Sequence, residues 1–199
     1  MSSFTKLPNV IGLYSPAPKM GKSCVVKYVM SEIAPMLGYN IVNIKISAPL
    51  KDPLYKLGLT ERHIEGDLKD VPCPELSGMT PRNKMIELFE AGCKRMNSRA
   101  WLSLVAAQEI FKALEKGQNV LVDDVRNPSD YEMIRAFNEP DNFVRAEVWR
   151  LYRPQALASS DDGKLEGQLE EHSFHANFLN DTEEVRFLHR LIDKHLGVF

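Results

Sequence analysis

Short apolar runs alternate with amphipathic segments along the chain, and this alternation predicts strands separated by helices. The apolar runs lie at residues 10–14, 40–46, 119–124, 143–151 and 174–179. Runs of this length with many β-branched residues are typical of buried strands. Strands that alternate with helices indicate an α/β fold of three layers, in which a mainly parallel sheet is flanked by helices.

Apolar residues spaced three or four positions apart predict the helices. Their expected ranges are 22–37, 81–96, 99–114, 128 to before 140, and 185–196. Thr80 and Asn127 stand directly before a proline, an arrangement that favours the start of a helix. Between the second strand and residue 79 the prolines predict a loop-rich stretch, and the polar residues 153–171 predict a mobile loop.

Composition restricts the classes of protein that the chain can belong to. Of the 199 residues, 44% are hydrophobic and 26% are charged, which is typical of a globular chain and suits one domain. The formal net charge is −2. Proteins that bind nucleic acid usually carry an excess of basic residues, so the charge disfavours a nucleic-acid partner, although it is compatible with a local basic pocket.

Cysteine usage and hydropathy predict the compartment. The three cysteines, Cys24, Cys73 and Cys93, lack metal-ligand spacing, and their odd number gives no closed set of disulfides. No signal peptide opens the chain, and no apolar run approaches the roughly 18 residues that span a membrane. We therefore expect a cytoplasmic protein without a membrane partner.

The segment between the first strand and the first helix has the sequence of a phosphate-binding loop. It ends in Gly21-Lys22-Ser23, in the strand–loop–helix context that the template G-x-x-x-x-G-K-[ST] requires. Gly21 would let the backbone approach a phosphate, Lys22 would reach the β- and γ-phosphates, and Ser23 Oγ would coordinate Mg²⁺. The expected nucleotide-binding residues are Lys19, Met20, Gly21, Lys22, Ser23 and Cys24.

The match to the template is incomplete. Pro16 stands where the template has its first glycine, and Pro18 follows. Proline has no N–H and fixes φ, so the loop loses two possible amide donors, while Lys19 could supply compensating positive charge. An ordinary corner between a strand and a helix is the alternative interpretation of these residues.

Two carboxylates follow the buried run at 119–122. Asp123 and Asp124 lie where a parallel strand presents functional groups, at its C-terminal end. Because neighbouring strand residues alternate between faces, we expect the two to face opposite sides. Either Asp123 or Asp124 would hold Mg²⁺, directly or through water, together with Ser23. We take Asp123 as the metal-binding candidate and Asp124 as the substrate-binding candidate.

Phosphoryl transfer also needs cations around the transferred group, and arginine suits phosphate because its planar fork donates two hydrogen bonds. The basic candidates near predicted element ends are Lys51, Arg82, Arg99, Arg126, Arg150 and Arg153.

In these segments the sequence resembles the deoxynucleoside monophosphate kinases of tailed bacteriophages. The resemblance is carried by the Gly-Lys-Ser loop, residues 48–52, residues 80–82 through Gly92 to Arg99 and Trp101, residues 122–128, and Arg153-Pro154. It implies a P-loop fold similar to nucleoside monophosphate kinases, within a single kinase domain over 1–199. It also implies a helical acceptor-binding segment at about 47–100 and a lid-like loop at about 153–171.

The same resemblance implies an activity. The γ-phosphoryl group of ATP would be transferred, with Mg²⁺, to a deoxynucleoside 5′-monophosphate. The catalytic residues implied are Lys22, Arg82, Arg99, Arg126 and Arg153. The substrate-binding residues implied are Lys51, Arg82, Arg99, Asp124 and Arg126.

The chain departs from the family in its phosphate-binding loop, where Pro16 replaces the first glycine and the common ending Gly-Lys-Asp-Thr is Gly-Lys-Ser-Cys. The chain is also short for the family, which is compatible with a reduced acceptor lobe or lid. Two alternatives stay open: a kinase acting on a modified pyrimidine in phage DNA, and a nucleotide-binding regulator without catalysis. A homodimer is compatible with the sequence, and a phage-encoded protein would act in the host cytoplasm.

Overall fold

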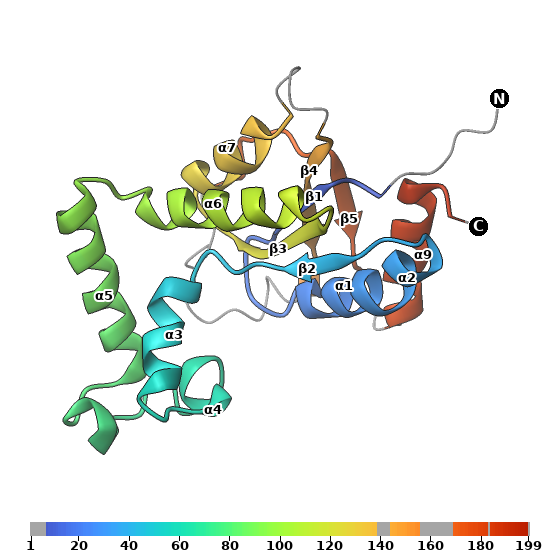
Figure 1. Cartoon of the computed structure of the whole chain (residues 1–199). Helices are drawn as coiled ribbons and strands as arrows, with labels where there is room; N and C mark the ends of the chain where they lie inside the picture. Colours follow the sequence, from blue (N-terminus) through green and yellow to red (C-terminus); the bar gives the residue numbers. More distant parts are fainter. Residues whose placement is uncertain (1–6, 139–143, 156–168, 183, 199) are drawn as a thin grey trace. The chain divides into compact units, whose positions relative to one another are not determined.

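The computed structural model describes residues 7–138, 144–155, 169–182 and 184–198. The chain divides into two compact units (Figure 1). The first, the sheet unit, consists of Met1–Lys45 and Ala106–Phe199, and the second, the helical unit, of Ile46–Val105. The helical unit overlaps the segment at about 47–100 that the resemblance implies to be helical.

Five parallel strands form the sheet of the first unit, in the order β2-β3-β1-β4-β5. Their bounds are β1 Val10–Tyr14, β2 Ile41–Asn43, β3 Asn119–Val125, β4 Ala146–Tyr152 and β5 Ala176–Leu179. The predicted α/β class with a mainly parallel sheet is therefore confirmed. β2 is shorter than the expected 40–46, although the Ile44 N–H still donates to the Leu121 carbonyl at 2.8 Å.

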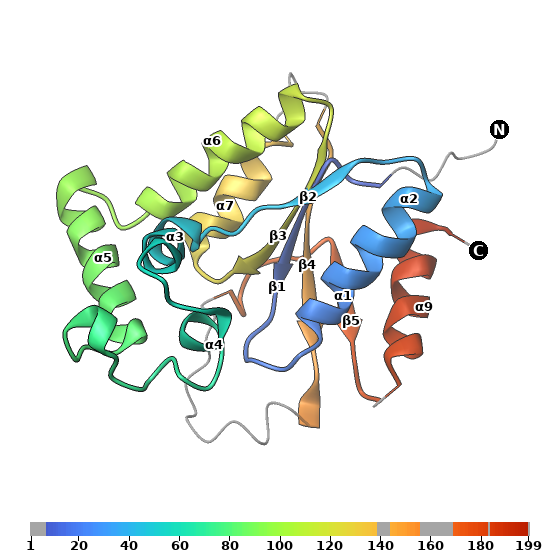
Figure 2. The same ribbon diagram turned by 60° about the horizontal axis from the view of Figure 1, so that its bottom comes forward.

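Helices cover both faces of this sheet (Figure 2). The connection from β1 through α1 (Lys22–Tyr28) passes β3 to reach β2, whereas the connection from β3 through α7 (Pro128–Ala136) passes β1 to reach β4. Right-handed crossovers that run in opposite directions place their helices on opposite faces. α9 (Val185–Leu196) packs beside α1, so these two helices share one face of the sheet.

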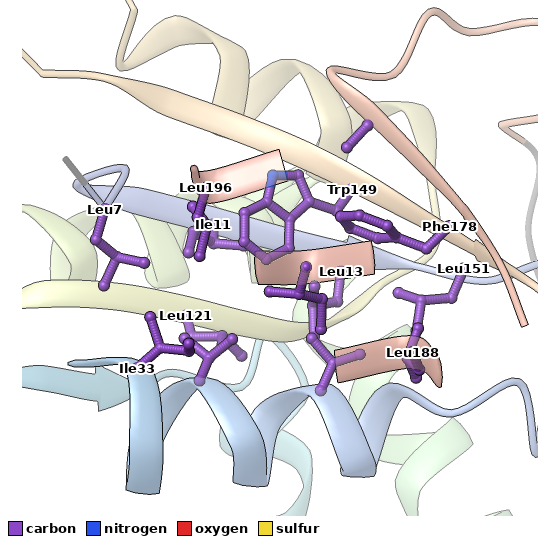
Figure 3. Close-up of a cluster of buried hydrophobic side chains, with 14 of the residues drawn as sticks. Leu7, Ile11, Leu13, Ile33, Leu121, Trp149, Leu151, Phe178, Leu188 and Leu196 are labelled. Atoms are coloured by element: carbon purple, nitrogen blue, oxygen red, sulfur yellow. The ribbon is translucent and has the colours of Figure 1, made fainter. Parts of the chain in front are cut away.

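The larger core of the sheet unit lies under α1 and α9. Strand residues Ile11, Leu13 and Leu121 pack there against helix residues that include Val25, Val29, Leu188 and Ile192 (Figure 3). Trp149 of β4 is fully buried in this core, with its ring edge-on to Phe178 at 5.5 Å between centroids.

On the opposite face of the sheet, α7 approaches β1 closely at Gly12. A Cβ at Gly12 would collide with Ile134 Cδ1 of α7. α7 therefore packs directly against the backbone of β1, and glycine at position 12 permits this contact.

The first helix departs from the predicted regular α-helix over 22–37. α1 ends at Tyr28, a π-helical turn follows over Val29–Ile33, and α2 covers Ala34–Met36. The Ala34 N–H bonds to the Val29 carbonyl, five residues back. Pro35 has no N–H and its ring would clash with the carbonyl four residues earlier, so the widened turn accommodates it.

The helical unit contains two helices where a loop-rich stretch was expected. α3 covers Ala48–Lys56 and α4 covers Glu61–Ile64, and they are followed by α5 (Pro81–Met96). α6 (Trp101–Glu115) begins in this unit and continues into the sheet unit from Ala106. The core of the helical unit consists of Leu54, Leu59, Ile64, Cys73, Leu76 and Met85.

Gly92 of α5 gives Trp101 its packing position. A Cβ at Gly92 would overlap the indole ring, whose Nε1 donates to the Phe89 carbonyl at 3.2 Å. The close contact between α5 and the start of α6 therefore requires the smallest residue at position 92.

A buried ionic network joins the start of β4 to α9. Glu147 is 7% exposed, and its carboxylate accepts hydrogen bonds from Arg145, Trp149 and His195. Burial raises the pKa of Glu147, but the bonds from His195, Trp149 and Arg145 outweigh it and lower the pKa to about 2. The carboxylate is therefore charged over the whole neutral range.

Within the described ranges, every helix is too short or too polar to span a bilayer.

Candidate functional site

A pocket of about 280 Å³ opens in the sheet unit beside the start of α1. It is lined by residues 19–24, by Arg153 after β4, by Asn180 and Thr182 after β5, and by Val185 and Leu188 of α9. These segments follow the C-terminal ends of β1, β4 and β5, the edge at which open α/β sheets bind ligands. The structure thus brings Arg153 together with all six residues expected to bind the nucleotide.

The loop before α1 turns through two left-handed backbone positions. Lys19 has φ 61° and Gly21 has φ 107°. Gly21 is the N-cap of α1, and its carbonyl accepts the Val25 N–H at 3.1 Å. A Cβ at Gly21 would lie 3.0 Å from Asn180 Nδ2 and 3.2 Å from Leu188 Cδ2, so both conformation and space require glycine here.

The ends of β4 and β5 hold the loop in place. Asn180 Nδ2 donates to the Met20 carbonyl at 3.2 Å, and the Asn180 backbone N–H donates to the Tyr152 carbonyl at 2.8 Å. The Arg153 N–H lies 3.0 Å from Met20 Sδ. Met20 and Asn180 are both buried. The loop conformation therefore depends on residues about 130 to 160 positions later in the chain.

The prolines occupy the base of the loop, with Pro16 buried and Pro18 exposed. Across Pro16, the Ser15 hydroxyl donates to the Ala17 carbonyl at 2.9 Å. Both prolines precede the pocket lining, which begins at Lys19. The backbone N–H groups from Lys19 to Ser23 are therefore retained despite the departure from the template.

Positive charge dominates the pocket. Lys19, Lys22 and Arg153 line it, and none of the described lining residues is acidic. The Nε atom of Arg153 is buried and has no hydrogen-bond partner within the described part of the chain. A buried guanidinium N–H without a partner favours binding of an acceptor-rich anion.

A β-bulge lies at Asp123 and Asp124. Gly12 pairs with Val122 and Tyr14 pairs with Val125, so the two carboxylates stand opposite Leu13 alone. A Cβ at Gly12 would lie 3.2 Å from Val125 Cγ2, which puts Val125 on the same face as the Gly12–Val122 pair. The bulge interrupts the regular alternation of faces between Val122 and Val125, so alternation alone no longer determines the face of Asp124, and the expectation that the two aspartates face opposite sides stays a prediction.

Asp123 is joined to β2 by a hydrogen bond from Asn43 Nδ2 to Asp123 Oδ2, 3.2 Å long. The Oδ1 atoms of both residues are buried and have no partner among the described residues. Buried oxygens of this kind fit Mg²⁺ or its waters, since this ion is usually held by one or two carboxylates together with phosphates and water. Within the described ranges, no group of three or more His, Cys, Asp or Glu side chains could hold a metal.

Arg126 is exposed at the start of the turn that leads into α7. Its backbone N–H and that of Asn127 both donate to Asp130 Oδ2, at 3.1 and 3.0 Å. The predicted helix start at Asn127 and Pro128 is confirmed, and the capping fixes the backbone from which the Arg126 side chain projects.

Three of the expected basic residues lie in the helical unit, and each contacts a carboxylate there. Lys51 is buried, with Nζ 2.5 Å from Glu65 Oε1. Arg82 makes a two-pronged pair with Asp70, at 2.5 and 3.0 Å. Arg99 lies 3.2 Å from Glu90 and over the Phe89 ring at 5.3 Å. Their acceptor-binding role stays a prediction.

Asn180, Thr182, Val185 and Leu188 line the pocket but were not predicted from the sequence. A signal for Asn180 exists, because a polar residue directly follows the short run at 174–179 and parallel strands carry functional groups at that end.

Most of the expected lid-like loop, residues 156–168, lies outside the described residues.

Comparison of the sequence with protein-family models and with curated proteins yields no match.

Proposed function

We propose that the protein is a kinase that uses ATP and Mg²⁺ to phosphorylate a deoxynucleoside 5′-monophosphate. The observation that carries this proposal is the pocket that Lys22, Ser23 and Arg153 line together. It combines three cations, a left-handed glycine at the start of a helix, and the C-terminal edge of a parallel sheet. A triphosphate is the ligand class that this combination suits best.

The sheet supports the finer assignment to the P-loop class. β1 lies in the middle of the order β2-β3-β1-β4-β5, and the chains leaving β1 and β3 turn to opposite faces. Ligands of open α/β sheets bind where neighbouring connections diverge in this way. The loop after β1 is therefore at the position where a phosphate-binding loop is expected.

In this proposal each residue of the pocket has an electrostatic role. Lys22 holds the β- and γ-phosphates, the backbone N–H groups from Lys19 to Ser23 bind phosphate oxygens, and Arg153 neutralises charge on the transferred group. Ser23 Oγ and Asp123 are the residues that hold Mg²⁺. When bound, this ion neutralises charge on the phosphate oxygens.

The acceptor follows from the resemblance to the phage kinases. Its phosphate is already ionised near neutral pH, so the protein needs no general base. Lys51, Arg82 and Arg99 are the proposed acceptor-binding cations of the helical unit. In the sheet unit the proposed substrate-binding residues are Arg126, a cation, and Asp124, a carboxylate. Cations in this number suit a dianionic phosphate.

The test is release of ADP with ATP, Mg²⁺ and each common deoxynucleoside or ribonucleoside monophosphate in turn. We expect turnover with one or a few deoxynucleotides, which would also identify the base. If protein that binds ATP releases no ADP with any of these monophosphates, the proposed acceptor is overturned. Transfer of labelled phosphate to DNA would then establish the DNA kinase, and binding without any transfer would establish a regulator.

A further inference from the structure

Asn43 and Asp123 form a polar pair at the ends of two neighbouring strands. β2 and β3 are parallel, with Asn43 in register with Leu121, so Asp123 lies diagonally one pleat further along β3. The 3.2 Å bond from Asn43 Nδ2 to Asp123 Oδ2 crosses this diagonal. This contact determines which way the Asn43 amide is turned, because the reverse orientation would set Asn43 Oδ1 against Asp123 Oδ2, and both are acceptors.

The pair leaves two acceptor atoms without protein donors. Asp123 Oδ1 and Asn43 Oδ1 are both buried, and neither has a hydrogen-bond partner in the described part of the chain. Buried polar atoms in native proteins are nearly always satisfied, so such atoms require a ligand, an ion or water. An unpaired amide oxygen beside an unpaired carboxylate oxygen favours a hydrated cation over an anion.

The pair also lies on the sheet face that carries the loop's helix. Leu121, which shares the register of Asn43, belongs to the core packed under α1, the helix that begins with Lys22 and Ser23. Asp123 is therefore supported from the strand next to its own, on the face from which Ser23 is presented.

We propose that Asn43 is a positioning residue for the magnesium ion of the nucleotide site. Its Nδ2 holds the Asp123 carboxylate through Oδ2, so that Asp123 Oδ1 stays directed to the ion or its water. Asn43 Oδ1 supplies a second acceptor for the waters that Mg²⁺ retains. This inference rests on the proposed binding of a magnesium nucleotide, and its readout does not need phosphoryl transfer.

The experiment measures binding of Mn²⁺, as a probe for Mg²⁺, to the protein saturated with ADP, by the electron paramagnetic resonance of free Mn²⁺. Wild type is compared with Asn43→Ala, with Asn43→Leu, which keeps the branched shape of the side chain without its polar atoms, and with Asn40→Ala as control. Asn40 is exposed and immediately precedes the same strand. Thermal unfolding establishes that each variant is folded.

We expect both Asn43 variants to bind Mn²⁺ about 10-fold more weakly, in the range found for residues that orient metal ligands. Their affinity for ADP in EDTA and the Mn²⁺ affinity of Asn40→Ala stay at the wild-type value. Unchanged Mn²⁺ affinity in a folded Asn43 variant would overturn the role of Asn43 and leave the kinase proposal intact. Failure of the wild type to bind Mn²⁺ with ADP would overturn both. The expected weakening without phosphoryl transfer to any acceptor would support Asn43 and overturn only the kinase activity.

Discussion

Asn180 Nδ2 donates a hydrogen bond to the Met20 carbonyl, joining residues 160 positions apart in the chain. The bond lies in the interior, next to the backbone of Gly21. It connects the end of β5 to the loop that lines the pocket. The shape of this loop is therefore set by tertiary contacts as well as by its own sequence.

The first prediction concerns this bond. Asn180→Ala leaves the buried Met20 carbonyl without its donor, which costs about 1–2 kcal/mol in the free energy of unfolding. We also expect about 10-fold weaker binding of ADP, equivalent to about 1.4 kcal/mol. Urea denaturation and calorimetric titration measure the two effects. Asn177→Ala, an exposed change within β5, should alter neither quantity.

The second prediction tests the charge of the loop. Lys22→Ala removes the cation proposed to hold the β- and γ-phosphates, and we expect kcat/KM for phosphoryl transfer to fall about 100-fold or more. The melting temperature should change little, because Lys22 lies at the helix start and is half-buried. Lys27→Ala, on the exposed side of the same helix, is the control. Wild-type turnover in Lys22→Ala would refute the assignment of the loop.

The third prediction separates backbone strain from steric fit. Gly21 and Gly38 both have positive φ, at 107° and 75°, but only Gly21 has neighbours within reach of an added Cβ. Gly38→Ala should cost about 1 kcal/mol of stability from backbone strain alone. Gly21→Ala should cost more and should also abolish tight ADP binding, because the methyl group displaces Asn180 or Leu188. Equal effects of the two changes on stability and on ADP binding would contradict this account.

The fourth prediction follows from the pKa of Glu147. The folded pKa of about 2 lies below the ordinary 4.5, so the network stabilises the protein above pH 4.5, and this contribution is lost as the pH falls towards 2. The shift corresponds to about 3 kcal/mol. The difference in free energy of unfolding between wild type and Glu147→Gln should therefore be largest near pH 7 and should shrink below pH 4.5.

Urea denaturation at pH 7, 4.5 and 3 measures this difference. Glu132→Gln, an exposed change on α7, should show no such dependence on pH. A difference for Glu147→Gln that stays constant from pH 7 to 3 would show that the network contributes through shape rather than charge.

Much of the sheet unit could be predicted from the sequence because its strands are short apolar runs, and all but β5 have glycine or proline near their boundaries. The five strands and the helices after residue 80 lie close to their expected positions. α3 was missed because Pro49 and Pro53 resemble loop residues. Pro49 fits the first turn of a helix, and burial of Leu54 in the core of the helical unit stabilises a segment with weak helical propensity.

The candidate site was predictable only where one continuous motif defines it. Residues 19–24 form such a motif, whereas Asn180 joins them through contacts that no local pattern encodes. The bulge at Asp123 and Asp124 likewise depends on pairing with β1, so the sequence of the strand alone could not predict it. Tertiary pairing, rather than composition, determines these details.

The chain has two tryptophans, and each unit holds one of them. Trp149 is fully buried between β-strand and α9 residues, while Trp101 lies against Gly92 in the helical unit. Each indole is thus an intrinsic fluorescent reporter for its own unit. Trp101→Phe leaves only Trp149 to emit, and subtraction of its signal from that of the wild type isolates Trp101. Comparing the two emission transitions during denaturation would reveal whether the units lose their structure in one step or in sequence.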